Sequence, residues 1–564
     1  MSLKRATMAP AVADHTSLSI QRSLKQDVRN LFSSPYGQEG NLQTRKLNMK
    51  IEDKNTEIMV QKLSLGEPTM KPTKVILLVG GTGSGKTTLI NNMVNFIYRV
   101  EFTDDFRLIL IDDKNASKCS QAESQTNMIT AYFFNNLKGM PFDYNYVLID
   151  TPGFGDTRGI ERDRILMVQL KDFLKQNYGI DQVDGIGFVT PSSAARLTPT
   201  QHYVYDGLSS MFGKDVKDNI YIMATFADAR TPPIMDVLKA ADIKYSDLYK
   251  FNNSALYASN KGNESESESD DEDESYHINK LFWEMGYKSI NKFFKKLGMT
   301  FPVRLTLTIE VLEERNKLQI TTIGLQNQIH IGLSKLANLN KERSMLARFG
   351  DDMQGCANYK EEIEVPKIIK INLEKGVHVT NCLTCNMTCH YPCCVKIDTL
   401  KFLCSEMTRF YCRVCPQKCF FIMHVNNTFR FDTRWHTEER TVQELFDRYK
   451  KAEQGMLDKQ AVVKAIEEDI NNLSGHLIDT IKTTQKCVDR LEKIALKPNP
   501  LATREYIEIL IESEKQQKKH NFRDRIAMLQ KLKEEVAVVQ GVRSNDSSES
   551  GEALLQHFQK LMTE

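Results

Sequence analysis

The chain has 564 residues, more than one ordinary domain needs, which favours three or four structural units. Hydrophobic residues make up 41% and charged residues 26% of the sequence, a balance that excludes wholesale disorder. The net charge is only +2, so overall electrostatics favour no nucleic-acid partner. The longest apolar runs, such as Val75 to Val79, are too short for a bilayer span, and no apolar signal core follows the N-terminus. We expect a cytoplasmic protein.

The first part of the chain changes character near residue 70. Residues 1–70 are polar and aperiodic, which predicts a flexible or weakly helical N-terminal segment. From Lys74 to about Phe251, apolar runs of strand length alternate with helical stretches, as in a doubly wound parallel sheet. The expected strands begin at Lys74, Phe106, Tyr146, Asp184, Ile220 and Ser254. We therefore predict an α/β domain over 71–300, closed by an amphipathic helix from Tyr276 to Leu297.

An acidic stretch interrupts this domain. Eight of the eleven residues from Glu264 to Glu274 are acidic, and serines separate several of them. Such a run is typical of a solvated loop, and we predict a disordered loop over 263–275.

A phosphate-binding pattern follows the first predicted strand. Residues Gly80 to Thr87 read GGTGSGKT and fit G-x-x-x-x-G-K-[ST] between a strand and the predicted helix 87–97. Glycines let backbone N–H groups surround phosphates, and a helix N-terminus adds its positive dipole end. Lys86 is expected to contact the β- and γ-phosphates, and Thr87 to bind Mg²⁺. The predicted nucleotide contacts here are Gly80, Gly81, Thr82, Gly83, Ser84, Gly85, Lys86, Thr87 and Thr88.

A second phosphate-side element lies after another predicted strand. The apolar run from Tyr146 ends in Asp150 and continues Thr-Pro-Gly153. A carboxylate at the carboxyl end of a neighbouring strand can hold Mg²⁺ through water, and the Gly153 amide can face a γ-phosphate.

Phosphate recognition does not identify the base. Asp228 lies just past the strand from Ile220. A carboxylate accepts the N1–H and N2–H of guanine, whereas adenine has an acceptor at N1, so Asp228 would select guanine. The same residue could instead cap the next helix, and the sequence leaves both roles open.

Five separated motifs occur in the order found in one known family. Over Lys71 to Leu297 the chain resembles the septin-like GTPases, most closely their immunity-associated (GIMAP or IAN type) and paraseptin branch. This resemblance implies a GTP-binding fold with nucleotide-dependent dimerisation or polymerisation, often at membranes. The motifs are Gly80–Thr87, Asp150–Asp156, Ala195–Thr198, Phe212–Gly213 and Thr225–Asp228.

The resemblance also implies roles for single residues. Asp150 to Gly153 would form the γ-phosphate switch, Thr225 and Asp228 the base-reading motif, and Asn252 and Asn253 the last guanine-contacting loop. Switch I would lie within 117–130, with Thr126 as the Mg²⁺-contacting threonine and Thr130 as the alternative. Lys86, Thr126 and Gly153 are the residues expected to act in catalysis.

Two positions depart from the usual GTPase pattern. Phe226 stands where the base motif commonly has a lysine, which weakens the guanine prediction. Phe154 follows the switch glycine, where Ras-like enzymes have a glutamine that orients the attacking water. Hydrolysis is therefore expected to be slow or to depend on a residue from elsewhere. Arg158 and Arg196 are candidates only, because each is more readily explained as a surface or structural arginine.

Cysteines cluster in one short region. Nine of the twelve cysteines lie between Cys382 and Cys419, and several are separated by two residues. Two-residue gaps let paired thiolates reach one tetrahedral ion, which predicts a zinc module over 351–436 with donors for one or two ions. The spacing does not fit the RING ligase order, and free or redox-active thiols are the alternative. The candidate zinc ligands are Cys382, Cys385, Cys389, His390, Cys393, Cys404, Cys412, Cys415, Cys419 and His424.

The remaining segments are predicted to be helical. Apolar residues recur at sevens between Val311 and Leu346, within a predicted helical segment over 301–350. A longer three-four alternation from Val442 to Ile494 predicts a coiled coil or helical hairpin within 437–541, followed by a C-terminal tail over 542–564. Self-packing and intermolecular pairing are equally compatible with these patterns.

Two functions compete on this basis. The first is a guanine-nucleotide-dependent switch or assembly protein that hydrolyses GTP slowly with Mg²⁺ and is activated by homodimerisation or by a partner. The second is a nucleotide-binding scaffold with little hydrolysis, acting through its zinc module and coiled coil. The sequence identifies no protein partner, and it carries no lipid-anchor signal, so membrane association stays open.

Overall fold

The fold was analysed in a computed structural model. It describes residues 37–111, 128–155, 160–258, 270–319, 360–441 and 484–498, with short gaps at 40–41, 57, 177, 229, 374–375, 394, 405, 409 and 416–417, and scattered helical positions at 24, 322, 468, 482 and from 507 to 533. The chain divides into two compact units, the first formed by residues 1–311 with 495–500 and the second by the rest.

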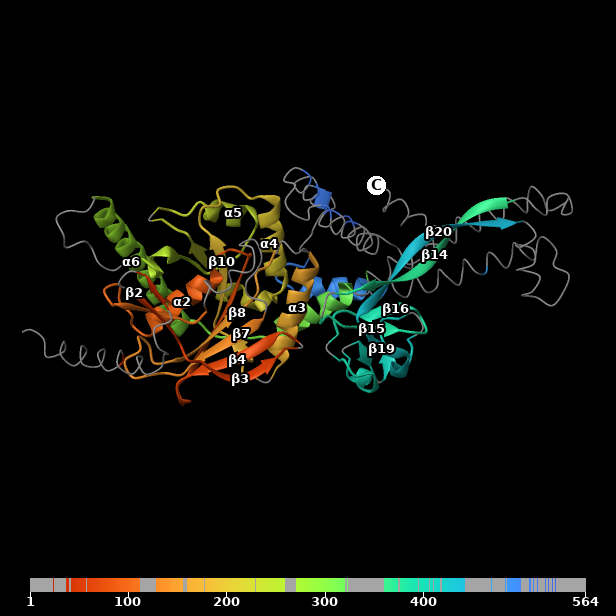
Figure 1. Ribbon diagram of the computed structural model, residues 1–564, viewed down its shortest axis with the longest axis horizontal. Helices are drawn as coiled ribbons and strands as arrows, with labels where there is room; N and C mark the ends of the chain where they lie inside the picture. Colours follow the sequence, from red (N-terminus) through yellow and green to blue (C-terminus); the bar gives the residue numbers. More distant parts are fainter. Residues whose placement is uncertain are drawn as a thin grey trace, which may run out of the picture. The chain divides into compact units, whose positions relative to one another are not determined.

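The first unit is built on an eight-stranded sheet with the order β12-β11-β10-β5-β8-β7-β4-β3 (Figure 1). The five strands from β12 to β8 run parallel, whereas β7 is antiparallel to β8. The strands of this sheet are β3 (Lys50–Asn55), β4 (Val60–Leu65), β5 (Thr73–Gly80), β7 (Ile129–Phe134), β8 (Asn145–Asp150), β10 (Gly185–Pro191), β11 (Ile220–Thr225) and β12 (Asp247–Lys250).

Helices cover both faces of this sheet, with α2 and α6 on one side and α3 and α4 on the other (Figure 1). The helical elements are α2 (Lys86–Ile97), α3 (Ile160–Lys175), α4 (Pro199–Ser210), η1 (Lys214–Asn219), α5 (Ile234–Ala240), η2 (Asn253–Leu256) and α6 (Asp270–Met299). Buried aromatic rings join α2 and α6 to the sheet: Phe294 lies 5.5 Å from Phe96 and 5.0 Å from Tyr146 between ring centres. Burial of this apolar interface is the main stabilising contribution on that face.

The residue pattern explains the start of α4. Thr198, part of one motif shared with the septin-like GTPases, accepts a hydrogen bond from the Gln201 N–H, and the Gln201 side chain accepts one from the Thr198 N–H. With Pro199 in the first turn, this reciprocal capping box fixes the helix start. Thr198 therefore has a structural role.

The structure differs from the sequence prediction at both ends of this unit. Residues 42–65, expected to be flexible or weakly helical, contain β3, β4 and β2 (Leu42–Lys46). The predicted strand at Ser254 is wrong, because that segment forms η2, while β12 supplies the edge strand. Helix α6 begins at Asp270, inside the segment 263–275 predicted to be a disordered loop. Short polar strands are missed because their pairing depends on neighbours distant in sequence.

A small sheet and short ladders complete the unit. The predicted strand from Phe106 forms β6 (Phe106–Ile109), but it pairs with β2 outside the main sheet. The remaining strands are β1 (Gly37–Glu39), β9 (Gln182–Val183) and β13 (Val303–Arg304).

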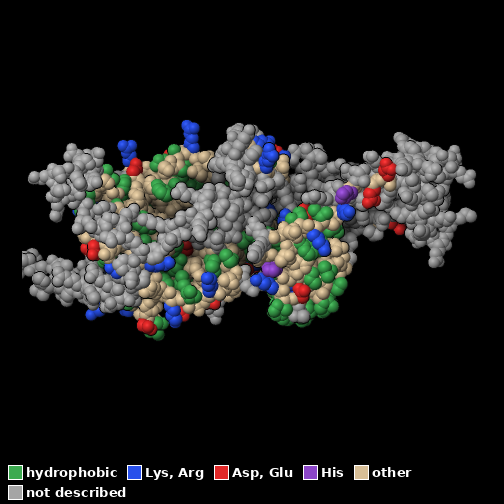
Figure 2. Space-filling view, viewed as in Figure 1, with side chains coloured by type: hydrophobic (Ala, Val, Ile, Leu, Met, Phe, Trp, Pro, Cys, Tyr) green, Lys and Arg blue, Asp and Glu red, His purple; other side chains and the backbone are tan. Residues whose placement is uncertain are grey.

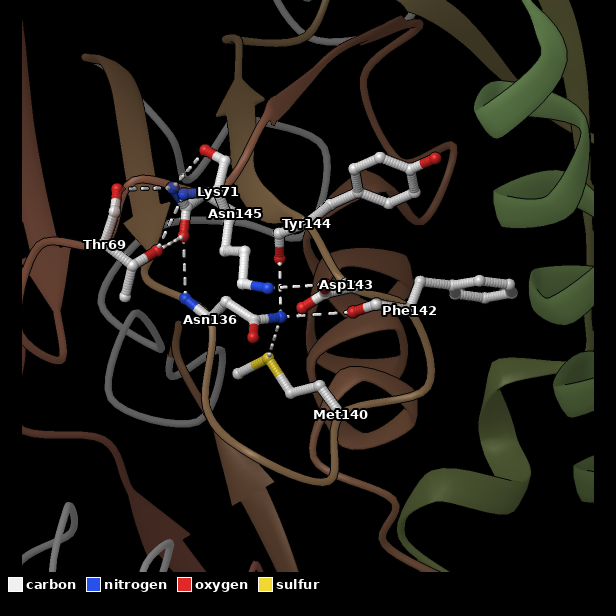
Figure 3. Close-up of polar contacts among 8 residues, drawn as sticks. All are labelled: Thr69, Lys71, Asn136, Met140, Phe142, Asp143, Tyr144 and Asn145. Carbon is white, nitrogen blue, oxygen red and sulfur yellow. Dashed lines mark hydrogen bonds and ion pairs between the residues drawn. The ribbon is translucent and has the colours of Figure 1, made fainter.

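A polar network holds the end of the sheet where β8 begins (Figure 3). The Asn145 amide donates to the carbonyl oxygen of Lys71 at 2.9 Å, and its oxygen accepts from the Thr69 hydroxyl at 2.7 Å. Asn136 donates to the carbonyl oxygens of Phe142 and Tyr144 and so shapes the turn between β7 and β8. These amides satisfy backbone groups that no strand pairs.

The second unit contains a small cysteine-rich fold joined to a long two-stranded ladder. Strand β14 (Lys360–Asn372) pairs antiparallel with β20 (Phe429–Thr441) along thirteen positions. Because β20 extends to Thr441, residues 437–441 are a strand, and the coiled-coil segment predicted from 437 cannot begin there. The small fold contains β15 (Val379–Cys382), β16 (Met387–His390), η3 (Asp398–Leu403), β17 (Met407–Thr408), β18 (Tyr411–Cys412), η4 (Phe421–Met423) and β19 (His424–Asn427).

Exposed apolar side chains are frequent on this small fold. Figure 2 shows hydrophobic side chains gathered around its lower edge in that view. More than a third of the surface of each of Leu403, Phe410, Tyr411 and Ile422 is exposed. Since the fold has few other apolar residues to form a core, its stability requires another source of cross-links.

Helix is also present in parts of the predicted helical segments. Residues 306–319 and 484–494 are helical, and Val311, Cys487 and Leu491 are buried. Most of the two heptad runs lies outside the described residues. Among the described residues, no helix is long and apolar enough to cross a membrane.

Candidate nucleotide-binding site and cysteine cluster

The predicted phosphate loop connects β5, at the centre of the sheet, to α2. Gly85 immediately precedes α2 and has a φ of 83°, and Gly83 has a φ of 74°, values that side-chain-bearing residues rarely adopt. The ammonium of Lys86 donates to the carbonyl oxygens of Gly80 at 3.0 Å and Gly81 at 3.1 Å. Thr87 and Thr88 lie half-buried in the first turn of α2. The loop therefore holds a positive charge within its own backbone.

The charge of Lys86 is in an unfavourable environment. Its side chain is buried, and burial lowers the pKa of its ammonium to about 8, although the nearby Asp150 carboxylate opposes this shift. An anion placed at the loop would relieve the cost of burying this charge.

The predicted switch residues lie directly beside the phosphate loop. Asp150 ends β8, pairs with Leu78 of β5 in register, and is buried. The Thr82 N–H donates to the Phe154 carbonyl at 3.0 Å, and the Phe154 N–H donates to the Gly80 carbonyl at 3.1 Å. A change in either loop would therefore move the other.

Glycine is required at the switch position 153. A Cβ atom added to Gly153 would lie 2.5 Å from Thr82 Oγ1 and 2.7 Å from Thr82 Cα. Because the Thr82 backbone cannot move without displacing the phosphate loop, a larger residue would separate the two loops. The close approach requires glycine at this position, and the contact of the Gly153 amide with a γ-phosphate stays a prediction.

The Phe154 side chain packs against α4. Its ring is buried against α4, where a Cβ added to Gly207 would lie 2.2 Å from it, and it packs on Tyr203 with ring centres 5.5 Å apart. Tyr203 also donates to Asp163 of α3, which accepts from the Gly155 N–H. Phe154 thus anchors the switch segment to the helices and cannot orient a water molecule.

The two residues predicted to read the base, Thr225 and Asp228, lie in different environments. Thr225 is buried, and its hydroxyl donates to the Ser84 carbonyl at 2.7 Å, so it holds the phosphate loop against the end of β11. Asp228 is exposed, and one of its carboxylate oxygens accepts from the Arg230 N–H at 2.8 Å. It does not cap α5, whose N-terminal residue outside the helix is Pro233. Phe226, between them, is 59% exposed and has a φ of 51°.

Asn252 and Asn253 follow β12 at the same sheet edge. Asn252 accepts from the Ser254 hydroxyl at 2.7 Å and caps η2. Asn253 is buried and accepts from the Asn92 side chain of α2 at 3.1 Å. The structure therefore gives Asn253 a packing contact, and Asn252 the more exposed position.

Among the remaining predicted residues of the site, Thr130 lies beside the predicted switch residue Asp150. Thr130 lies in β7, opposite Asp150 in register, and its hydroxyl accepts from Gln61 at 2.9 Å. Arg196 is exposed. Thr126 and Arg158 lie outside the described residues.

Two buried asparagines of α2 were not identified from the sequence. Asn95 exchanges hydrogen bonds with the backbone of Leu108, and Asn91 accepts from the Leu110 and Ile111 N–H groups. They tie the helix after the phosphate loop to the chain leading toward the predicted switch I. Their spacing of four, which places them on one face of the helix, was the available signal.

All ten predicted metal ligands converge in the cysteine-rich fold. Their ligand atoms form three groups whose members lie within 4.8 Å of one another. The described cysteines are not disulfide-bonded, and the Cys385 and Cys419 sulfurs are 3.7 Å apart, far beyond an S–S bond. The groups are Cys382, Cys385, Cys415 and Cys419; Cys389, Cys412, Cys415 and His424; and His390, Cys393 and Cys404. These groups could hold metal ions.

The sheet order and the loop together define the class of the first unit. Loops after the parallel strands β5, β8, β11 and β12 meet at the carboxyl edge of the sheet, where ligands bind in open α/β folds. The glycine-rich loop that follows the central strand and opens a helix is the P-loop. The first unit is thus a P-loop nucleoside triphosphatase fold.

Comparisons with known proteins add little beyond this class. No protein-family model matches the sequence, and no curated protein matches it. Toc33 from Arabidopsis thaliana in complex with Mg²⁺ and GMPPNP is 13% identical, with a TM-score of 0.23 over 39% of this chain and 86% of that one. A structure of an oligomerised bacterial dynamin pair is 14% identical, with a TM-score of 0.21 over 51% and 56%. Because these scores are low, the class rests on the strand order and the phosphate loop.

Proposed function

We propose that the chain is a guanine-nucleotide-binding switch or assembly protein that hydrolyses GTP slowly with Mg²⁺. The observation that carries this proposal is the buried Lys86 ammonium, which rests on the Gly80 and Gly81 carbonyls in a glycine-rich loop. Phosphate oxygens are stronger acceptors for this charge than carbonyls, so a bound triphosphate would take their place. Thr87 and the buried Asp150 carboxylate fit the hard-oxygen environment that Mg²⁺ needs, directly or through water.

Guanine is the base we propose, because Asp228 is an exposed carboxylate just beyond β11. Calorimetric titration with GTP, GDP and ATP tests this directly, and we expect GTP and GDP to bind more tightly than ATP. Asp228→Asn should weaken GTP binding at least tenfold, about 1.4 kcal/mol. It should improve binding of xanthosine triphosphate, since xanthine has a C2 carbonyl where guanine has an amino group. Preference for ATP would overturn the role of Asp228.

We propose that hydrolysis depends on association of protomers. The Phe154 side chain packs against α4, and no side chain at that position can orient the attacking water as a glutamine would. A residue from a second protomer or another partner would then complete the site, and Arg196 is one exposed candidate. Turnover per molecule should increase with protein concentration, and Lys86→Ala should abolish it. A rate independent of concentration would contradict activation by assembly.

The competing function is a nucleotide-binding scaffold, which the buried Phe154 side chain also favours. Prolonged incubation with excess GTP separates the two functions. GDP formation that disappears in Lys86→Ala supports the GTPase, whereas stable GTP on a protein that binds it supports the scaffold.

We further propose that the cysteine-rich fold holds structural Zn²⁺ in a cytoplasmic protein. Its donors are thiolates and imidazoles, which are the usual ligands of Zn²⁺. Mg²⁺ prefers oxygen ligands and would not suit this site. Removal of the metal with a strong chelator should expose the buried thiols to modification and make the fold sensitive to protease. Readded Zn²⁺ should restore protection under reducing conditions. A chelator without effect on thiol reactivity would contradict a structural metal.

A further inference from the structure

We propose that seven of the donors in the cysteine-rich fold form one binuclear cluster, in which the thiolate of Cys415 bridges two Zn²⁺ ions. This inference rests on the proposal that zinc is the bound metal. It concerns the two four-member groups described above, which have one residue in common.

The number of ligands leads to the bridge. Two tetrahedral ions have eight coordination positions, and the two groups supply seven different residues. Both ions reach four protein ligands only if one residue serves both. Cys415 is the residue that lies within 4.8 Å of all other members of both groups.

The distances fit tetrahedral zinc. With a Zn–S bond of about 2.3 Å, the sulfurs on two corners of a tetrahedron are about 3.8 Å apart. The sulfurs of Cys385 and Cys419 are 3.7 Å apart, on the side of the first ion. On the side of the second ion, the Cys415 sulfur lies 3.8 Å from Nε2 of His424. The Cys415 sulfur and the His424 Nε2 are therefore close enough to bind the same zinc ion.

The orientation of His424 supports its role as a ligand. Its Nδ1 lies 3.1 Å from the carbonyl oxygen of Phe420, which can only accept, so Nδ1 carries the hydrogen. This tautomer leaves the lone pair of Nε2 directed at the cluster. Such a hydrogen bond from the second ring nitrogen is usual for metal-bound histidine.

Backbone N–H groups are directed at the sulfurs. The Cys419 N–H donates to the Cys415 sulfur at 3.3 Å, and the Cys385 N–H donates to the Cys382 sulfur at 3.4 Å. Cys412 receives two such bonds, from the N–H groups of Val414 and Cys415. These donors favour sulfur in its anionic, metal-binding form. The turns that carry Cys-x-x-Cys are therefore shaped around thiolates in both groups.

The bridge would join four of the short strands of this fold. Cys382 ends β15, Cys389 lies in β16, Cys412 in β18 and His424 at the start of β19. One shared sulfur would cross-link the β15–β16 pair to the β17–β18 pair.

The third group has a different character. His390, Cys393 and Cys404 share no member with the cluster, and among the described residues they are one donor short of a tetrahedral site with four protein ligands. The buried Lys401 ammonium is 3.8 Å from the Cys393 sulfur. This group serves as a matched control, because changing it should leave the bridge intact.

The first experiment uses the full-length wild-type chain and needs no variant. The protein is loaded with ¹¹³Cd²⁺, a thiophilic substitute for zinc, and its ¹¹³Cd NMR spectrum is recorded. A bridging sulfur transmits scalar coupling between two cadmium ions, so we expect one pair of mutually coupled resonances. X-ray absorption of the zinc form should add a zinc–zinc separation of about 3.8 Å, the value for two Zn–S bonds meeting at a tetrahedral angle.

Variants of the full-length chain assign the bridge. Cys415→Ser should remove the coupling and affect both resonances of the pair, with loss of up to two zinc equivalents. Cys385→Ser removes a ligand of one ion only, so it should shift or abolish mainly one resonance of the pair. Cys404→Ser, from the third group, should keep the coupled pair, and circular dichroism of each variant checks that the chain is folded.

The outcomes separate the two proposals. Metal-bound protein with uncoupled ¹¹³Cd resonances and no short zinc–zinc distance would overturn the bridge and leave the zinc proposal standing. Purified, folded protein that binds neither zinc nor cadmium, with all of these thiols open to modification, would overturn the zinc proposal itself.

Discussion

The hydroxyl of Thr225 donates a hydrogen bond of 2.7 Å to the carbonyl oxygen of Ser84, which joins the end of β11 to the phosphate loop. A second contact of 3.2 Å reaches the carbonyl oxygen of Thr190 in β10. One buried side chain thus fixes the loop to two strands of the sheet. Thr225 is buried against the loop, whereas Asp228, the other predicted member of the same motif, is exposed to solvent.

Replacing Thr225 with valine should weaken binding of all nucleoside triphosphates to a similar extent. The change leaves the buried Ser84 carbonyl without its donor, at a cost of about 1–3 kcal/mol. Where this cost falls on the nucleotide-bound state, the affinity decreases by about 5- to 150-fold. Titration calorimetry with GTP and ATP measures this. Thr225→Ser keeps the hydroxyl and should bind almost as wild type. A selective loss of GTP binding would show that Thr225 reads the base.

Replacing Phe154 with glutamine should destabilise the first unit without accelerating hydrolysis. The ring fills a site against Gly207, and its loss creates a cavity and buries an amide, at a cost of about 3 kcal/mol or more. Thermal unfolding and GTP turnover are the measurements. Phe226→Gln makes the same change at an exposed ring and should alter stability by less than about 0.5 kcal/mol. Faster turnover in Phe154→Gln at unchanged stability would contradict the packing role.

Nucleotide affinity should decrease as the pH rises above 8. Burial lowers the pKa of Lys86 to about 8 in the ligand-free protein, and bound phosphates would raise it again. Below pH 8 the ammonium is already charged, so affinity changes little. Above pH 8 binding requires proton uptake, and the dissociation constant should increase by up to about tenfold per pH unit. Measurements between pH 7 and 9 cover this range.

A permanently charged side chain provides the control for this pH dependence. Lys86→Arg should bind nucleotide more weakly, because the planar guanidinium does not fit the Gly80 and Gly81 carbonyls. The guanidinium cannot lose its proton in this pH range. Its affinity should stay nearly constant over the same interval. An equal slope in both proteins would assign the titration to another group.

Replacing Asp184 with asparagine should destabilise the sheet. Asp184 is buried, pairs with Lys74 at 2.8 Å and accepts the Val75 N–H at 2.8 Å. Leaving the Lys74 ammonium without its partner costs about 3–5 kcal/mol. The exposed pair of Lys71 and Asp143, 2.6 Å apart, is the comparison (Figure 3), and Asp143→Asn should cost less than about 1 kcal/mol. The free energy of unfolding of both variants is measured with a denaturant. Equal losses of stability would contradict the stronger role of the buried Asp184 pair.

Local patterns predicted the parts of the fold that local rules govern. The buried strands β5, β8, β10 and β11 are continuous apolar runs, and the phosphate loop needs its residues in consecutive order. The same holds for cysteines spaced for tetrahedral binding. The polar strands β3 and β4 and the edge strand β12 were missed, because partners distant in sequence stabilise them.

The sequence by itself determined that this chain has a glycine-rich phosphate loop with Lys86, a neighbouring Asp150, and ten clustered donors for metal. These features depend on residue type and spacing over short distances, so they can be read without a structure. Only the tertiary structure decided that Phe154 faces α4, that Thr225 supports the loop while Asp228 stays exposed, and that Cys415 lies in two ligand groups. Each of those outcomes depends on which distant segments pack together, and packing is a property of the whole fold.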